Sequence, residues 1–170
     1  LGLTRSADEA RSRAADAEQG RATAEEDRAR LFDLALDPIC TADLNGYFLE
    51  LNPAWERTLG WSREELCARP FVDFVHPPDR AATDRAAAAL AEGHDVVHFE
   101  NRYRTKSGEL RWLRWAAHAD VERERIYAVA HDVTESKEQE RALMEAKRRA
   151  ESATLAKSHF LANMSHEIRT

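Results

Sequence analysis

The residues with the clearest chemical potential lie near the C-terminal end of the sequence, where His166 is followed directly by Glu167. A neutral imidazole is a competent nucleophile near pH 7. An adjacent carboxylate can orient the ring, accept its other proton and stabilise the charge that develops during attack. The sequence therefore predicts His166 as a nucleophile and Glu167 as its orienting acid or base. The alternative is a surface histidine on a helix, and His159, which no carboxylate follows, is assigned a structural role.

The segment that carries His166 is predicted to be one long helix. From Glu135 to Thr170 the sequence has no glycine or proline and consists mainly of helix-favouring residues. Positions spaced alternately by three and four residues predict a dimeric coiled coil, whose seam runs through Leu143, Ala146, Ala150, Ala153, Lys157, Phe160 and Met164. Lys157 departs from the apolar pattern, and it marks a local loosening or a slightly different register.

A second helix is expected at the N-terminal end, within residues 1–30. From Ser6 to Arg30 the composition is dominated by Ala, Glu, Asp and Arg, without aromatic residues or proline. Alanines three or four residues apart form a thin apolar seam, which Gly20 interrupts: Ala7, Ala10, Ala14 and Ala17. A coiled-coil helix is the favoured interpretation, and a solvated, partly frayed helix is the alternative.

The compact part of the chain is expected between these helices, at residues 31–134, because it holds nearly all the aromatic residues and all five prolines. Asn45-Gly46 between two apolar runs predicts a β-hairpin, and Ser62 to Glu65 has the form of a capping box. A helix is predicted at 81–92, and three more strands at 96–103, 110–119 and 125–133. This order predicts an α+β fold with one five-stranded antiparallel sheet and helices on one face.

The bulk composition restricts the classes of function. A chain of 170 residues, 43% apolar and 33% charged, has room for one core and helical extensions but hardly for two full-sized domains. The formal net charge of −6 makes nucleic acid an unexpected partner. Cys40 and Cys67 lack C-x-x-C spacing and fit a reducing, cytoplasmic setting. No apolar stretch approaches the roughly 20 residues of a membrane span, although the parent protein could be anchored elsewhere.

The middle segment resembles a PAS domain over roughly one hundred residues. Several short motifs carry the resemblance through their order and spacing: the Asn45-Gly46 hairpin, Asn52-Pro-Ala-Trp55, Gly60-Trp-Ser-Arg-Glu-Glu-Leu66, His76-Pro-Pro-Asp79, Arg102-Tyr-Arg-Thr-Lys-Ser-Gly108 with Arg111-Trp-Leu113, and Asp132-Val-Thr134. The resemblance implies a sheet and a helical face that enclose a small interior, used for sensing or for dimerisation.

The junction Asp132-Val133-Thr134 resembles the motif that couples the last PAS strand to an outgoing signalling helix. An Asp or Thr at this place can cap the unpaired N–H groups of the helix, and a cap without a signalling role is the alternative. We expect a signalling helix over residues 135–157.

Residues 158–170 are similar to the phosphoacceptor box at the start of the dimerisation helices of histidine kinases. The similarity implies that His166 accepts a phosphoryl group. It also implies that Thr170, one helical turn later on the same face, positions water for dephosphorylation.

These resemblances together predict the sensory and relay fragment of a two-component histidine kinase. The sequence has no glycine-rich phosphate cradle, so ATP and Mg²⁺ would bind to a separate catalytic domain and the fragment alone is expected to be inactive. The implied partners are a second copy of the chain, that catalytic domain and the receiver domain of a response regulator. The alternative is a PAS binding or dimerisation module that regulates a different effector.

The sequence also bears on cofactors. Flavin-binding relatives need a reactive cysteine where this sequence has Arg69-Pro-Phe71, and Cys67 lies too early, as a buried small apolar residue. Haem-binding relatives place a histidine on the helix predicted at 81–92, whereas His94 and His98 lie beyond it. The histidines show no metal-ligand spacing. We therefore expect no haem, flavin or metal ion, and we expect the core to be empty.

Two further expectations concern aromatic and histidine side chains. Trp112 and Trp115 lie three residues apart on one predicted strand, so their side chains point to opposite faces. One is expected in the core and the other on the outer face, and two core-edge aromatics are the alternative; periodicity does not tell which one is inside. His76, before two prolines, is expected to cap a turn.

Overall fold

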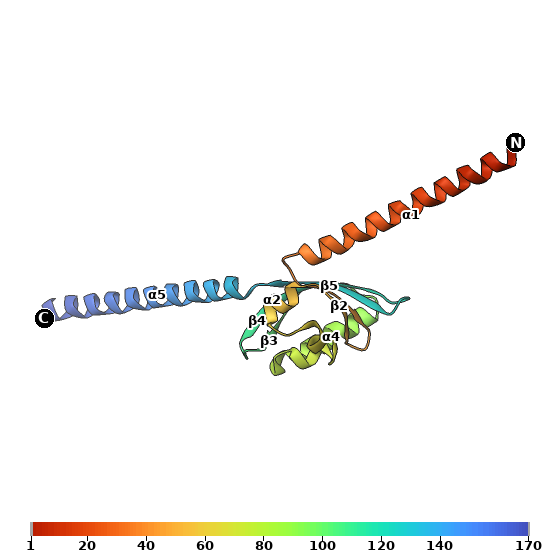
Figure 1. The fold of residues 1–170 in the computed structure, drawn as a ribbon. Helices are drawn as coiled ribbons and strands as arrows, with labels where there is room; N and C mark the ends of the chain where they lie inside the picture. Colours follow the sequence, from red (N-terminus) through yellow and green to blue (C-terminus); the bar gives the residue numbers. More distant parts are fainter. Residues whose placement is uncertain (1, 170) are drawn as a thin grey trace. The chain divides into compact units, whose positions relative to one another are not determined.

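The structure is a computed structural model that describes residues 2–169, with side chains from residue 7 (Figure 1). The chain divides into two compact units, and the boundary between them lies after His131. In order, the elements are α1 (Gly2–Leu34), β1 (Ile39–Asp43), β2 (Phe48–Leu51), α2 (Ala54–Leu59), α3 (Arg63–Cys67), the 3₁₀ helices η1 (Phe71–Phe74) and η2 (Pro77–Asp79), α4 (Arg80–Ala91), β3 (Val96–Arg104), β4 (Leu110–Asp120), β5 (Arg125–Asp132) and α5 (Thr134–Arg169).

The strands form one sheet in the order β2-β1-β5-β4-β3. β1 pairs antiparallel with β2 and with β5, and β3 pairs antiparallel with β4. The inner face of this sheet and the helices between β2 and β3 share one apolar core. The predicted α+β fold, with a five-stranded sheet and helices on one face, is confirmed.

Local sequence signals explain the first half of the domain. The carboxylate of Asp43 accepts hydrogen bonds from the backbone N–H groups of Asn45 (3.0 Å) and Tyr47 (2.8 Å), and Gly46 supplies the positive φ of +90° that closes the hairpin. The predicted capping box is present: Ser62 Oγ accepts from the Glu65 N–H at 3.3 Å, and Glu65 Oε2 accepts from the Ser62 N–H at 2.8 Å.

Aromatic rings fill the centre of the core around Trp55, which is only 1% exposed. Its ring centroid lies 5.0 Å from that of Phe48, 6.1 Å from that of Tyr103 and 5.7 Å from that of Trp115. Trp112 lies on the outer face, where the guanidinium of Arg102 stacks 5.0 Å from its ring. The two tryptophans of β4 therefore point to opposite faces, as expected, and Trp115 is the inner one.

The two long helices are continuous. α1 passes through Gly20 without a break, because an exposed helical glycine costs only about 1 kcal/mol relative to alanine. In α5 the larger apolar side chains are exposed in a single chain, from 43% at Met164 to 81% at Ile168. Across the described residues, no helix combines the length and the hydropathy that a membrane span requires.

Candidate functional site

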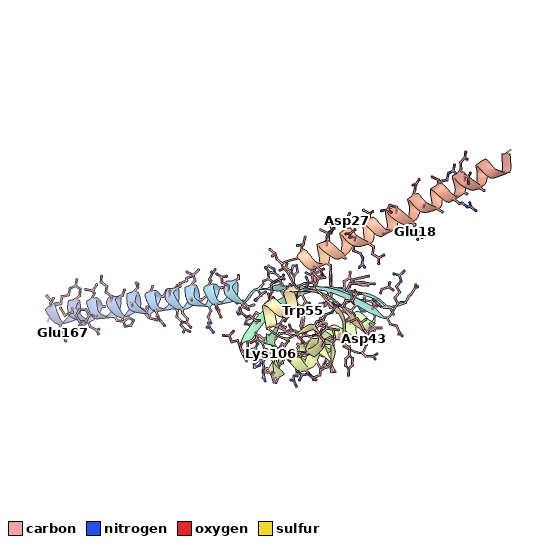
Figure 2. All side chains as sticks on the ribbon, in the orientation of Figure 1. Glu18, Asp27, Asp43, Trp55, Lys106 and Glu167 are labelled. Atoms are coloured by element: carbon pink, nitrogen blue, oxygen red, sulfur yellow. The ribbon has the colours of Figure 1, made fainter. Side chains whose placement is uncertain are left out.

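The predicted nucleophile lies near the end of α5. His166 and Glu167 are consecutive and exposed on this helix. Glu167 is labelled in Figure 2 near the end of α5. Consecutive helical residues point about 100° apart, so the two side chains leave the helix on neighbouring faces. Thr170, the third predicted residue of this site, lies outside the described residues.

The junction between β5 and α5 is built as a cap. Asp132 Oδ1 accepts hydrogen bonds from the N–H of Thr134 at 2.9 Å and from its hydroxyl at 2.5 Å. The carbonyl of Val133 accepts the N–H of Lys137 at 3.0 Å, which is the first helical bond. This geometry satisfies N–H groups that a helix start leaves unpaired.

A pair of part-buried charges joins two motifs that are far apart in the sequence. Asp79 accepts two hydrogen bonds from the guanidinium of Arg102, at 2.8 Å and 2.6 Å, and a third from its backbone N–H at 2.9 Å. The side chains are 16% and 27% exposed. Hydrogen bonding from Arg102 lowers the pKa of Asp79, and the same bonds raise the pKa of Arg102. The pair fastens the start of α4 to β3.

A second pair of motifs meets at the surface. The ammonium of Lys106 donates to both carboxylate oxygens of Glu65, at 2.8 Å and 2.9 Å, and the Trp61 ring N–H donates to the Arg104 carbonyl at 2.9 Å. Hydrogen bonding from Lys106 is the main cause of a lowered pKa of Glu65. The helix α3 is thereby tied to the turn between β3 and β4.

Asn52 organises the segment that leads into β1, a role that the sequence analysis missed. The side chain is buried; its Oδ1 accepts the Ile39 N–H at 2.9 Å, and its Nδ2 donates to the carbonyls of Phe32 (3.2 Å) and Asp37 (2.9 Å). The carboxylate of Asp37 also forms a hydrogen bond with the ring of His131, at 2.8 Å. His131 is the last residue of the first compact unit. The signal available in the sequence was an asparagine directly before a proline, Asn52-Pro53.

Inside the domain, α4 and the inner face of the sheet enclose a cavity of about 60 Å³. The space remains because several of the side chains around it are small, among them Ala42, Ala87 and Ala128. Cys40 and Tyr103 also line it and are each 2% exposed. Burial raises the pKa of the Cys40 thiol. Burial is also the main cause of the raised pKa of the Tyr103 phenol, and the charge that Cys40 would carry is the second cause. Both groups are therefore uncharged at neutral pH.

Hydrogen bonds link the two walls of this cavity. The ring N–H of Trp115 donates to Asn101 Oδ1 at 2.8 Å, and Asn101 Nδ2 donates to Thr83 Oγ1 at 2.9 Å. The Thr83 hydroxyl in turn donates to the carbonyl of Asp79 at 2.9 Å. A buried polar chain thus runs from β4 through β3 to α4.

Several histidine and cysteine expectations need correction or comment. His76 does not cap through its side chain: Pro77 and Pro78 have no N–H, and the one free N–H of that turn, on Asp79, is accepted by the His76 carbonyl at 2.8 Å. Its ring Nδ1 is buried without a partner among the described residues. Cys67 is half-buried at the edge of the core, and Cys40 is the fully buried cysteine.

The remaining histidines near α4 are exposed. His94 lies 3.8 Å from the carboxylate of Glu92, and His98 occupies a bulge of β3 with a φ of +60°. Neither residue lines the cavity. Over the described residues, no group of three or more His, Cys, Asp or Glu side chains is placed to hold a metal ion.

The chain is similar to several known proteins. Residues 48–131 match the family model described as PAS fold. The autoinducer 2 sensor kinase/phosphatase LuxQ of Vibrio parahaemolyticus is 30% identical over 143 residues, which are 82% of this chain and 16% of that protein. The histidine protein kinase DivJ of Caulobacter vibrioides is 32% identical over 111 residues, 65% of this chain and 18% of that protein. The chain thus spans less than a fifth of these relatives.

Solved structures share the fold. A domain of a sensory box sensor histidine kinase/response regulator from Geobacter sulfurreducens has a TM-score of 0.57 at 24% identity, covering 64% of this chain and 93% of that one. The PAS domain of a Colwellia psychrerythraea protein has a TM-score of 0.56 at 23% identity, covering 65% and 97%. At these identities the likeness establishes the fold.

Proposed function

We propose that this chain, which contains a PAS domain and is similar to sensor histidine kinases, is the sensory and signal-relay part of such a kinase, with His166 as the phosphoacceptor. The observation that carries the proposal is the continuity of α5. One helix begins at Thr134, directly after the last strand of the domain, and continues without a break past His166 to Arg169. One continuous helix therefore follows the PAS domain and carries the proposed phosphoacceptor.

The proposed chemistry is phosphoryl transfer from ATP. An imidazole nitrogen of His166 attacks the γ-phosphorus, a nitrogen–phosphorus bond forms, the bond to the bridging oxygen breaks and ADP leaves. Glu167 orients the ring and stabilises the charge that develops on it. Thr170 positions water for dephosphorylation, which is a hydrolysis. The catalytic domain of the parent protein supplies ATP and Mg²⁺, and the phosphoryl group passes to a response regulator receiver domain.

The proposed working unit is a homodimer, located in the cytoplasm where ATP is available. The seam of α5 leaves Leu143 72%, Phe160 62% and Met164 43% exposed in one chain. A second α5 would cover these side chains in a parallel coiled coil. The alanine-rich helix α1 would pair in the same way.

The proposed signal is a rotation or register change of this coiled coil. From Ser136 to His166 the helix spans roughly 45 Å, at about 1.5 Å per residue. Coupling over such a distance needs an element with two discrete packing arrangements, which a seam of small alanines provides. The cap of Asp132 on Thr134 is the proposed point where the change enters α5.

The phosphoacceptor is tested in the full-length parent protein with His166→Gln, and His159→Gln, one heptad earlier on α5, is the matched control. Autophosphorylation and transfer to the response regulator should be lost in the first variant and retained in the second. If His166→Gln retains phosphotransfer, the kinase assignment fails and a PAS module for another effector becomes the better reading.

The relay is tested by inserting one, two, three or four residues after Ala146. Kinase output should change with the inserted length, because each residue rotates the following helix by about 100°. Tryptophan fluorescence of the PAS core, which contains the buried Trp55 and Trp115, should stay constant across the series. Equal output in all the variants would eliminate the rotational mechanism.

A further inference from the structure

The segment between α1 and β1 consists of four residues, 35–38, and we call it the strap. The guanidinium of Arg57 donates a hydrogen bond to the carbonyl of Ala35 at 3.1 Å, and the side chain of Asn52 donates to the carbonyl of Asp37 at 2.9 Å. Asp37 precedes a proline, and the proline ring restricts the backbone of both residues to few conformations. The strap is therefore short and stiff, so it passes on a displacement of the end of α1 instead of absorbing it.

The strap also contacts the end of β5. The carbonyl of Pro38 accepts the N–H of Ala130 at 2.8 Å, next to the ladder between β1 and β5. The Oδ1 atom of Asp37 forms a hydrogen bond of 2.8 Å with the ring Nδ1 of His131. His131 directly precedes Asp132, whose carboxylate caps the start of α5. The strap thus holds β5 at the residue next to the cap of the outgoing helix.

Two of these anchors differ in how easily they break. Asn52 is 2% exposed, and its hydrogen bonds hold both the strap and the carbonyl of Phe32 in α1. The side chains of Asp37 and His131 are 45% and 62% exposed, so water competes for both groups and their link contributes little to the stability of the fold. The link between Asp37 and His131 can therefore open while the buried anchor stays closed. The strap has two discrete arrangements as a result, which is what a coupling element requires.

We propose that the strap and the link between Asp37 and His131 form a direct relay from α1 to the start of α5, which bypasses the core of the domain. A displacement of the end of α1 moves Asp37, and the link passes this displacement to the residue next to the α5 cap. Release of the link disconnects α1 from α5 and leaves the core in place. The inference rests on the proposed relay function, to which it adds an input that arrives through α1.

The test measures by NMR how a change in α1 reaches α5 within the 170-residue chain. Leu34→Gly loosens the last turn of α1, at a side chain that is 76% exposed. It should shift the backbone amides of residues 134–137, and this shift should be lost when His131→Ala is added. Asp37→Ala should abolish the shift equally. The two substitutions together should have no larger effect than either one, because they break the same link.

A second histidine–aspartate pair provides the matched control. His118 Nδ1 lies 2.6 Å from Asp95 Oδ1, and the two side chains are 66% and 61% exposed, so this pair resembles the strap link in chemistry and exposure. It joins β4 to the residue before β3 and has no part in the strap. With His118→Ala in place of His131→Ala, Leu34→Gly should still shift residues 134–137. Loss of the shift there as well would overturn the proposal, because any broken surface pair would then have the same effect.

Three other results would overturn the proposal. The first is no shift of residues 134–137 in the α1 variant alone. The second is a shift that survives His131→Ala or Asp37→Ala. The third is a shift of the buried Leu113 and Trp115 in β4 as large as that of residues 134–137, since the change would then travel through the core.

None of these measurements involves phosphotransfer, so the relay and the kinase assignment can fail separately. Failure of the coupling together with loss of phosphotransfer in His166→Gln would overturn the strap relay alone. Coupling through the strap together with retained phosphotransfer in that variant would support the relay and overturn the kinase assignment.

Discussion

The contact between Asp79 and Arg102 is the structural feature with the sharpest energetic consequence. Asp79→Asn keeps the shape of the side chain but removes its negative charge. It also replaces one acceptor oxygen by an NH₂ group, which can only donate. It disrupts the two-pronged contact with the guanidinium, whose hydrogen bonds measure 2.8 Å and 2.6 Å. Arg102 is then left mostly buried, at 27% exposure, without a counter-charge. Its stacking on Trp112 does not compensate for this loss.

The magnitude follows from these contacts. A hydrogen bond to a charged group contributes about 1.5–3 kcal/mol net, and bonds that share one carboxylate are not additive. With both side chains less than a third exposed, solvent screening is limited. We expect Asp79→Asn to reduce the free energy of unfolding by about 2–3 kcal/mol. For a domain of about 100 residues this lowers the Tm by about 10–20 °C.

The assay is denaturation followed by tryptophan fluorescence, which reports the PAS core. Asp84→Asn, exposed on the same helix α4, is the control and should change the Tm by no more than about 2 °C. The pKa of Asp79 is lower in the folded chain, so its stabilisation is present above about pH 4 and is lost as the pH falls through the folded value. The gap between wild type and Asp79→Asn should shrink in that range. A gap independent of pH, or an equal loss in Asp84→Asn, would refute the reasoning.

Three further substitutions test other contacts. Ser62→Ala removes the capping box of α3 and should cost about 1 kcal/mol in urea denaturation, whereas Ser62→Thr should retain most of the stability. Asn52→Ala leaves the Ile39 N–H without its acceptor and should cost about 2–3 kcal/mol, with faster hydrogen exchange at the Ile39 amide; unchanged exchange there would contradict the assigned bond. Tyr103→Phe should change the free energy of unfolding by less than about 1 kcal/mol, because phenylalanine keeps the ring contacts with Trp55 and Trp115; a larger loss would show that the hydroxyl itself stabilises the fold.

The elements that the sequence predicted well are those that a few adjacent residues determine. Asn45-Gly46 supplies a backbone conformation that few residues adopt, and Asp43 completes the turn from two residues away. The capping box of Ser62 and Glu65 is likewise closed within one helical turn. Such signals are local, so they operate before any tertiary contact is known.

The contacts that the sequence could not supply join residues far apart in the chain. Asp79 and Arg102 are separated by 23 positions, and Asn52 reaches a carbonyl 20 positions earlier. The alternation of side chains predicted that Trp112 and Trp115 lie on opposite faces of the sheet. Which of the two faces the core became clear only from the way β4 pairs with β3. The resemblance implied a small interior, but the size and lining of the cavity were beyond prediction, since it is the space that remains where small side chains from α4 and several strands meet.

The same distinction bears on α5, where the periodic pattern is present but its partner is not within one chain. A helix of this kind gains most of its stability from packing an apolar face, because helix propensity alone is marginal in water. In one chain, Leu155 is 64% and Ile168 81% exposed, so that face has no intramolecular cover. In the homodimer proposed above, a second α5 would supply the packing that stabilises this helix. The geometry around His166 would then depend on both chains, and a signal that alters how the two helices pack would reach the proposed phosphoacceptor.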